Sequence, residues 1–326
     1  MVSLGYTLSS EEFTAPELLD HAEAAEAAGF EYALISDHFH PWTTRQGNSP
    51  FVWSVLGALA ERTQAMRFGT GVTCPIQRIH PAIIAQAAAT TEALMPGRFF
   101  LGVGTGERLN EHIIGEHWPE NGERIKMLDE AIALIRRLWS GDEVTEHGEY
   151  FTTEHAQLFS LPDRPPPIYV AAGGSDAAEV AGRSGDGLVA VAPSEEIVDA
   201  YDDAATQSGP RIGQIQFCWD GSREAAVQTA LEYWPNAAWG GDVSQEIAVP
   251  ADFEAIAELV TEDSLTQKVT ASNDPQDFID AIREYERAGF DHVYFHQIGP
   301  RQREAIEFFS KEVKPAFAAA TEGVRS

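Results

Sequence analysis

The chain is poor in basic residues, above all in lysine. Among its 326 residues the only lysines are Lys126, Lys268, Lys311 and Lys314. In total 22 basic side chains stand against 51 acidic ones, which gives a formal net charge of −29. Binding to a nucleic-acid backbone or to an anionic membrane surface requires a basic footprint. The composition therefore excludes both classes of partner and leaves a small molecule as the expected ligand.

Cysteine and long apolar runs are also scarce. Cys74 and Cys218 are the two cysteines, too few for a disulfide framework or a metal cluster. The chain does not open with a basic segment followed by an apolar one, and no run approaches the roughly 18 apolar residues of a membrane-spanning helix. We expect a cytoplasmic protein.

The excess of acid over lysine also suggests adaptation to salt. At about 1 M salt the Debye length is only about 3 Å, so a very negative surface no longer repels itself. The composition predicts a halophile's protein.

Short apolar runs alternate with amphipathic stretches along the whole chain. The expected strands are residues 4–8, 32–36, 67–73, 99–103, 168–172, 187–191, 214–219 and 293–297. The expected helices are 16–28, 51–62, 81–94, 124–139, 176–184, 194–207, 223–233, 275–288 and 302–320. This alternation predicts an α/β fold, a single (β/α)8 TIM-type barrel spanning 1–326.

Two segments are additional to the strands and helices of a minimal barrel. Residues 143–159 read as a short hairpin, and residues 234–271 read as a longer helical insertion. Insertions usually lie on the loop face of a barrel, at the carboxyl ends of the strands, where substrates bind. We expect both of them there.

The second expected strand is followed by Asp37 and His38. Catalytic groups of a barrel come from the carboxyl ends of its strands, and histidine is the side chain best suited to accept a proton near neutral pH. A purely structural role, with Asp37 capping a turn and His38 buried, is the alternative. Trp42 follows in the same loop and could line a pocket for a ring.

His38 and His40 also allow a metal-dependent hydrolase. Such barrels need further histidine ligands after the fifth and sixth strands, where this chain has Gly173-Gly174 and Ala192-Pro193. The pattern therefore favours no metal.

Two glycine-rich turns follow other strands. Residues 102–107 read GVGTGE, with Asn110 three residues beyond Glu107, and their spacing differs from the dinucleotide fingerprint. Gly173-Gly174-Ser175 opens a helix whose free N–H groups could hold an anion such as a phosphate. A tight turn in the first case, and a helix cap by Ser175 or Asp176 in the second, are the structural alternatives.

In order and spacing these motifs resemble the luciferase-like, deazaflavin-dependent oxidoreductases, in the branch typified by the coenzyme F420-dependent glucose-6-phosphate dehydrogenases. The motifs are SDHFHPW at 36–42, GVGTGE at 102–107 with Asn110, LWSG at 138–141, AAGG at 171–174 and AGRSGDG at 181–187. They cover nearly the whole chain, most weakly from 207 to 271.

The resemblance implies a homodimeric barrel with F420 at the strand carboxyl ends. In it His38 is the base that removes a hydroxyl proton while hydride passes to C5 of the deazaflavin. Glu107 manages the proton or charge on the ring, and Trp42 lines the space between ring and substrate. The implied cofactor contacts are Asp37, Cys74, Thr105, Gly106 and Asn110, with Gly173, Gly174, Ser175, Ala177 and Ala178 toward the phosphate and tail. A non-proline cis peptide is implied at Gly71-Val72.

The sequence departs from the sugar-phosphate enzymes of this family at the substrate end. Those enzymes clamp the phosphate with lysines and an arginine, whereas residues 191–196 contain Glu195 and Glu196 and no lysine. Only Lys268 falls near the expected arginine, and Cys74 replaces a threonine. We therefore expect an uncharged substrate, a free sugar or a simple alcohol.

Four alternatives stay open from sequence alone. They are a glucose-6-phosphate dehydrogenase proper, an FMN-dependent monooxygenase of the same superfamily, the metal-dependent hydrolase, and a barrel that binds a flavin-like ligand without chemistry.

Overall fold

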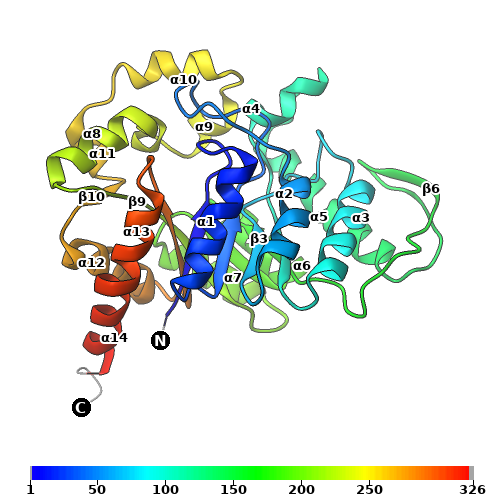
Figure 1. The fold of residues 1–326 in the computed structure, drawn as a ribbon. Helices are drawn as coiled ribbons and strands as arrows, with labels where there is room; N and C mark the ends of the chain where they lie inside the picture. The colour runs from blue at the N-terminus through cyan, green and yellow to red at the C-terminus, as the bar shows by residue number, and fades with distance from the viewer. Residues whose placement is uncertain (1, 323–326) are drawn as a thin grey trace.

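Eight parallel strands close into a barrel in the computed structural model, which describes residues 2–322 (Figure 1). They are β1 (Ser3–Leu8), β2 (Tyr32–Ile35), β3 (Arg67–Thr70), β4 (Phe99–Val103), β7 (Ile168–Ala171), β8 (Gly187–Ala190), β9 (Arg211–Trp219) and β11 (His292–Gln297). Each strand pairs with the next, and the pairs β8–β9, β9–β11 and β11–β1 complete the ring. The predicted barrel is confirmed.

Helices surround the barrel. They are α1 (Ala15–Ala27), α2 (Val52–Arg62), α3 (Pro81–Leu94), α5 (Asn121–Leu138), α6 (Ser175–Ser184), α7 (Glu195–Ala204), α8 (Arg223–Tyr233), α12 (Pro275–Arg287), α13 (Gln302–Phe308) and α14 (Lys314–Glu322), the last two joined by a π-helical turn at Phe309–Val313. Local signals start several of them. The side chain of Asp274 accepts from the N–H of Gln276 (2.9 Å) ahead of α12, and Pro275 occupies its first position.

The core has an inner and an outer layer. Leu34, Phe100, Val189, Ile212 and Tyr294 fill the inside of the barrel. The larger layer lies between strands and helices, where Leu18, Phe68, Leu128, Val170 and Phe278 are buried. A third, smaller cluster lies beneath the long insertion and includes Cys218, Trp234, Leu265 and Ile298.

The long insertion covers the carboxyl ends of the strands, as expected. It contains the 3₁₀ helix η2 (Pro235–Ala238), the helices α9 (Asp242–Glu246), α10 (Pro250–Ala257) and α11 (Glu262–Thr266), and the strand β10 (Thr270–Ser272), which pairs with the end of β9. In Figure 1 α9 and α10 lie at the same end of the barrel as α4 (Arg108–Glu111), the helix that follows β4. The strand β10 was not predicted.

Residues 143–159 form the expected hairpin, made of β5 (Val144–His147) and β6 (Thr152–Ala156). The expectation that this hairpin lies at the carboxyl ends of the strands was wrong. The hairpin leaves from the end of α5 and packs back along that helix, because the Glu130 carboxylate accepts from the backbone N–H groups of residues 149–151. The hairpin therefore does not cover the strand ends. No helix in residues 2–322 is long and apolar enough to cross a membrane.

Candidate active site

His38 lies where the loops after β1, β2 and β4 meet. Its Nε2 is 3.3 Å from Oε1 of Glu11 and 3.5 Å from Oε2 of Glu107. Its Nδ1 is 3.1 Å from the carbonyl oxygen of His40 and 3.2 Å from Nδ2 of Asn110. The side chain is 10% exposed. The Nε2 atom therefore faces two carboxylates at the edge of solvent.

Burial and charge act on His38 in opposite directions. Burial lowers the pKa of His38, but the Glu11 and Glu107 carboxylates and the bond to His40 together raise it above the ordinary value. Burial raises the pKa of Glu107, and the nearby His38 only partly offsets this effect. The pKa values of His38 and Glu107 are therefore both raised.

Two serine hydroxyls hold the carboxylate of Glu11 in place. Its Oε2 accepts from the hydroxyl of Ser36 (2.6 Å) and of Ser9 (3.2 Å). Burial raises its pKa, but His38, the Ser36 hydroxyl and His296 outweigh burial and lower the pKa. Glu11 is thus a buried, ionised partner of His38.

The neighbouring Glu12 forms a second buried acid–histidine pair. Its Oε2 is 3.2 Å from Nε2 of His296 on β11, and its Oε1 accepts from the N–H of Gly299 (2.8 Å). The ring of Trp234 packs against His296 at a centroid distance of 4.3 Å. Adjacent residues of one loop therefore reach two histidines, His38 in the loop after β2 and His296 on β11.

Asp37 is tied into a buried network. Its carboxylate accepts from the Thr73 hydroxyl (2.7 Å) and from the guanidinium of Arg78 (2.9 Å), which also lies 3.4 Å from the Glu111 carboxylate. Burial lowers the pKa of Arg78, but Asp37 and Glu111 outweigh it and raise the pKa. The network fixes the loop that carries His38. The predicted contact of Asp37 with the cofactor stays a prediction.

Asn110 joins the same loop to the turn after β4. Its Oδ1 accepts from the N–H groups of Phe39 (2.9 Å) and His40 (3.2 Å), and its Nδ2 donates to Glu107 (3.0 Å). The residue is buried. Asn110 therefore positions His38 and Glu107 relative to each other, and its contact with a cofactor stays a prediction.

The glycine-rich turn after β4 packs tightly against the loop after β3. The peptide Gly71-Val72 is cis, as the resemblance implied. Gly106 has a φ of 74°, and a Cβ there would meet the Sγ of Cys74 at 2.4 Å. Cys74 is buried beneath this turn, while Thr105 is partly exposed in it. Their roles as cofactor contacts stay predictions.

Trp42 belongs to an aromatic wall beside His38. Its ring lies 5.0 Å from the His38 ring and 5.2 Å from that of Phe253 on α10, against which Trp239 stacks at 6.3 Å. The buried Nε1 atoms of Trp234 and Trp239 have no hydrogen-bond partner within residues 2–322. The long insertion thus supplies flat apolar surface and two free donors next to the acid–histidine cluster.

The start of α6 is open, as an anion site requires. Gly173 and Gly174 are exposed, and a Cβ on either would meet no atom within 4 Å. The cap is Gly174, without a side-chain cap bond, so the structural alternative of a cap by Ser175 or Asp176 does not apply. Ser175 instead donates to the carboxylate of Glu196 (2.9 Å). Ala177 and Ala178 bury their side chains behind this first turn.

The His40 side chain has contacts of its own, apart from those of His38. Nδ1 of His40 donates to the carbonyl of Leu109 (2.9 Å), and its ring stacks on His112 at 5.6 Å. In the described part of the chain no group of three or more His, Cys, Asp or Glu side chains is arranged to hold a metal ion. Lys268 is exposed between α11 and β10, and its contact with substrate stays a prediction.

Sequence reasoning missed four residues of this site, namely Glu11, Glu12, Arg78 and Glu111. A signal for the first two was present, because Ser9-Ser10-Glu11-Glu12 follows β1 as the other motifs follow their strands. Arg78 lies 41 positions from its partner Asp37, so no local pattern joins them.

Comparison with known proteins agrees with this geometry. The family described as luciferase-like monooxygenase matches residues 2–292. A protein named F420-dependent glucose-6-phosphate dehydrogenase from Intrasporangium calvum is 36% identical over 97% of this chain and 98% of its own length. The protein of that name from Mycolicibacterium smegmatis is 35% identical over 96% of this chain and 97% of its own.

Solved structures agree as well. An F420-dependent secondary alcohol dehydrogenase, in complex with an F420–acetone adduct, superposes with a TM-score of 0.90 at 31% identity, over 97% of this chain and 99% of that one. The coenzyme F420-dependent tetrahydromethanopterin reductase from Methanopyrus kandleri, at 24% identity and a TM-score of 0.78 over 97% of this chain and 99% of that one, shares the fold. The chain is therefore a member of the luciferase-like family, in the branch of F420-dependent oxidoreductases.

Proposed function

We propose that this protein is an F420-dependent dehydrogenase that oxidises the CH–OH carbon of an uncharged alcohol or free sugar. The observation that carries the proposal is the buried His38, whose Nε2 faces Glu11 and Glu107 beside the aromatic wall of Trp42. The names of the relatives support F420 and a CH–OH donor.

The residues present fit such a cofactor. The exposed Gly173 and Gly174 at the open start of α6 offer backbone N–H groups to a phosphate without any lysine. Gly104 and Gly106 carry no side chains in the turn after β4, so a flat ring could approach the backbone there. When bound, F420 supplies the hydride acceptor.

In this proposal His38 accepts the hydroxyl proton at Nε2. With Nδ1 also protonated and donating to the His40 carbonyl oxygen at 3.1 Å, the ring becomes an imidazolium. Glu11 and Glu107 stabilise that positive charge at 3.3 and 3.5 Å. One proton thus remains on the protein for each hydride that leaves the substrate, and it returns to water when the product leaves.

The charges around the site favour an uncharged substrate. Residues 191–196, which follow β8, carry Glu195 and Glu196 and contain no lysine or arginine that could hold a substrate phosphate. The solved structure that superposes with a TM-score of 0.90 is that of a secondary alcohol dehydrogenase. The aromatic wall formed by Trp42 and Phe253 also suits an apolar alcohol.

The test follows the absorbance of oxidised F420 while secondary alcohols, free sugars and glucose 6-phosphate are added in turn, with FMN as a parallel cofactor. We expect reduction with an uncharged donor. His38→Asn should lower the rate by about 10²–10⁴, the range for a positioned base, while F420 still binds.

His155→Asn is the matched control, because His155 also pairs with a carboxylate, Glu143 at 2.9 Å, but lies exposed on the hairpin. It should leave the rate unchanged. Failure to bind F420 would overturn the proposal, and turnover of glucose 6-phosphate alone would overturn its substrate part.

A further inference from the structure

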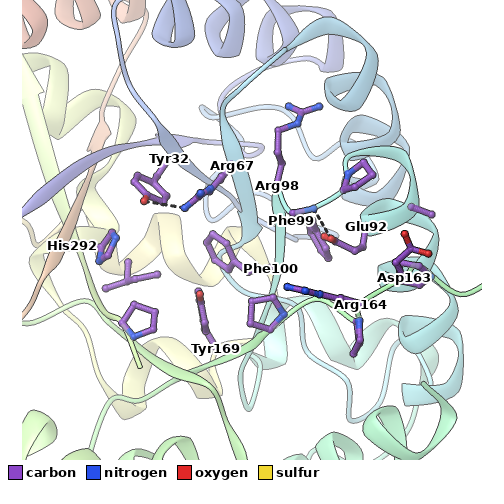
Figure 2. Close-up of a pocket in the computed structure, with 18 of the residues that line it drawn as sticks. Tyr32, Arg67, Glu92, Arg98, Phe99, Phe100, Asp163, Arg164, Tyr169 and His292 are labelled. Atoms are coloured by element: carbon purple, nitrogen blue, oxygen red, sulfur yellow. Dashed lines mark hydrogen bonds between the residues drawn. The ribbon is translucent and has the colours of Figure 1, made fainter. Parts of the chain in front are cut away.

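A cavity of about 860 Å³ lies at the opposite end of the barrel from His38 (Figure 2). It is lined by the residues that begin the strands, including Tyr32 of β2, Arg67 of β3, Phe99 of β4 and His292 of β11. The active-site residues follow the other ends of the same strands. The two sites are therefore separated by the packed inside of the barrel.

The arginines of this cavity are unusual for so acidic a chain. Most of the arginines elsewhere in the described chain pair with carboxylates, such as Arg136 with Asp186 at 2.8 Å and Arg211 with Asp202 at 2.7 Å. Within residues 2–322 the cavity's three arginines, Arg67, Arg98 and Arg164, have no carboxylate oxygen within 4 Å.

Two of these arginines remain available to a ligand. Arg98 is occupied, because it donates to the carbonyls of Ala60 and Met66 and to the Thr63 hydroxyl. Arg67 donates only to the hydroxyl of Tyr32 (3.1 Å). Figure 2 shows the side chain of Arg164 extending toward Phe100, and it has no hydrogen-bond partner in the described chain.

Aromatic rings form the walls between the two arginines. Tyr32 and Tyr169 are half-buried, and each packs on a buried ring of the barrel interior, Tyr32 on Tyr294 with centroids 6.1 Å apart and Tyr169 on Phe100 at 4.7 Å. Flat apolar faces of this kind bind other flat rings. Arginine adds bidentate bonds to carboxylate or phosphate.

Two carboxylates also line the cavity. Asp163 is exposed, and Glu92 is 6% exposed. One oxygen of Glu92 accepts from the N–H of Gly97 (2.6 Å), and the other has no partner in residues 2–322. Burial raises the pKa of Glu92, which reduces the negative charge it places there.

We propose that this cavity is a binding site for a flat aromatic anion, with its ring against Tyr32 and Tyr169 and its carboxylate or phosphate on Arg67 and Arg164. The proposal is independent of the F420 chemistry at the other end of the barrel.

Calorimetric titration with two probes tests it, 1-naphthoate as the carboxylate and AMP as the phosphate. We expect one probe to bind with one-to-one stoichiometry, and the stronger of the two identifies the anion. Arg164→Gln should weaken that binding about tenfold, which is 1.4 kcal/mol. Arg67→Gln should do the same.

Arg303→Gln is the control, since Arg303 is an exposed arginine on α13 outside the cavity. Unchanged dehydrogenase activity of Arg164→Gln would show that this variant is folded. Absence of binding by both probes, or equal affinities in Arg164→Gln and Arg303→Gln, would overturn the proposal.

Discussion

At the scale of single residues, the protonation of His38 depends on a neighbour that its own motif does not contain. Burial lowers the pKa of His38, and Glu11 followed by Glu107 raises it above the ordinary value. Because the base must be neutral to accept a proton, kcat/KM should rise with pH through this raised pKa.

Glu11→Gln should therefore move the acid limb of the pH profile to lower pH, since it removes the largest of the raising contributions. The measurement is kcat/KM against pH with the best alcohol substrate. Glu143→Gln, which alters the exposed pair with His155, should leave the profile in place. An acid limb that stays fixed or moves to higher pH in Glu11→Gln would contradict the assignment of Glu11.

Gly106 offers a second test at this scale. Its φ of 74° and the 2.4 Å approach of a Cβ to Cys74 predict that Gly106→Ala lowers the free energy of unfolding by about 1–3 kcal/mol. Gly122→Ala in the first turn of α5 meets no atom within 4 Å and should be neutral or stabilising. Denaturant unfolding compares the two, and equal stabilities would show that the turn after β4 adapts freely.

Some residues of the candidate active site could be predicted from the sequence and others could not. His38, Glu107 and Trp42 were predicted, and the structure brings them together, because each follows a strand end or shares the loop of one that does. Glu11 could have been found by applying the same rule to the first strand. Arg78 could not, because its place depends on two carboxylates that only the folded barrel brings to it.

At the scale of elements, the long insertion is fastened to α5 by one buried guanidinium. Arg124 is fully buried and donates to Gln245 (2.6 Å) and Glu246 (3.1 Å) of α9 and to the carbonyl of Pro119 (2.7 Å). Trp118 donates to the same Glu246 carboxylate (3.3 Å). These contacts hold α9 over the site.

Arg124→Met should loosen the insertion and raise KM more than it lowers kcat, since Trp239 and Phe253 belong to the aromatic wall beside His38 and are not assigned a step in the reaction. Limited proteolysis between 239 and 249 should become faster. Arg223→Met, which removes an exposed pair with Asp277, is the control. A fall in kcat with KM unchanged would contradict this role of Arg124.

The elements themselves were largely predictable. Strong apolar runs defined the eight strands of the barrel, and most helix ends agree within a few residues. The three-residue β10 was missed because so short a segment carries no periodicity. The position of the hairpin depends on Glu130 of a preceding helix, a contact that no local pattern reveals.

At the scale of the whole molecule, the charge of −29 should govern stability. Repulsion among surface carboxylates opposes folding until salt screens it. We expect the thermal midpoint to rise by several degrees as KCl is raised into the molar range, with a smaller rise in sucrose of equal osmolality. A midpoint indifferent to KCl would contradict adaptation to salt. The homodimer and the cytoplasmic location stay predictions.

The loop after β1 restricts how this site can change in evolution. Glu11 and Glu12 are consecutive, yet one serves His38 and the other serves His296. Loss or gain of one residue in Ser9-Ser10-Glu11-Glu12 would misplace both carboxylates at once, so substitutions can tune the two pairs separately while a change of loop length disables them together. Relatives that keep this chemistry should vary in the side chains of this segment and hold its length constant.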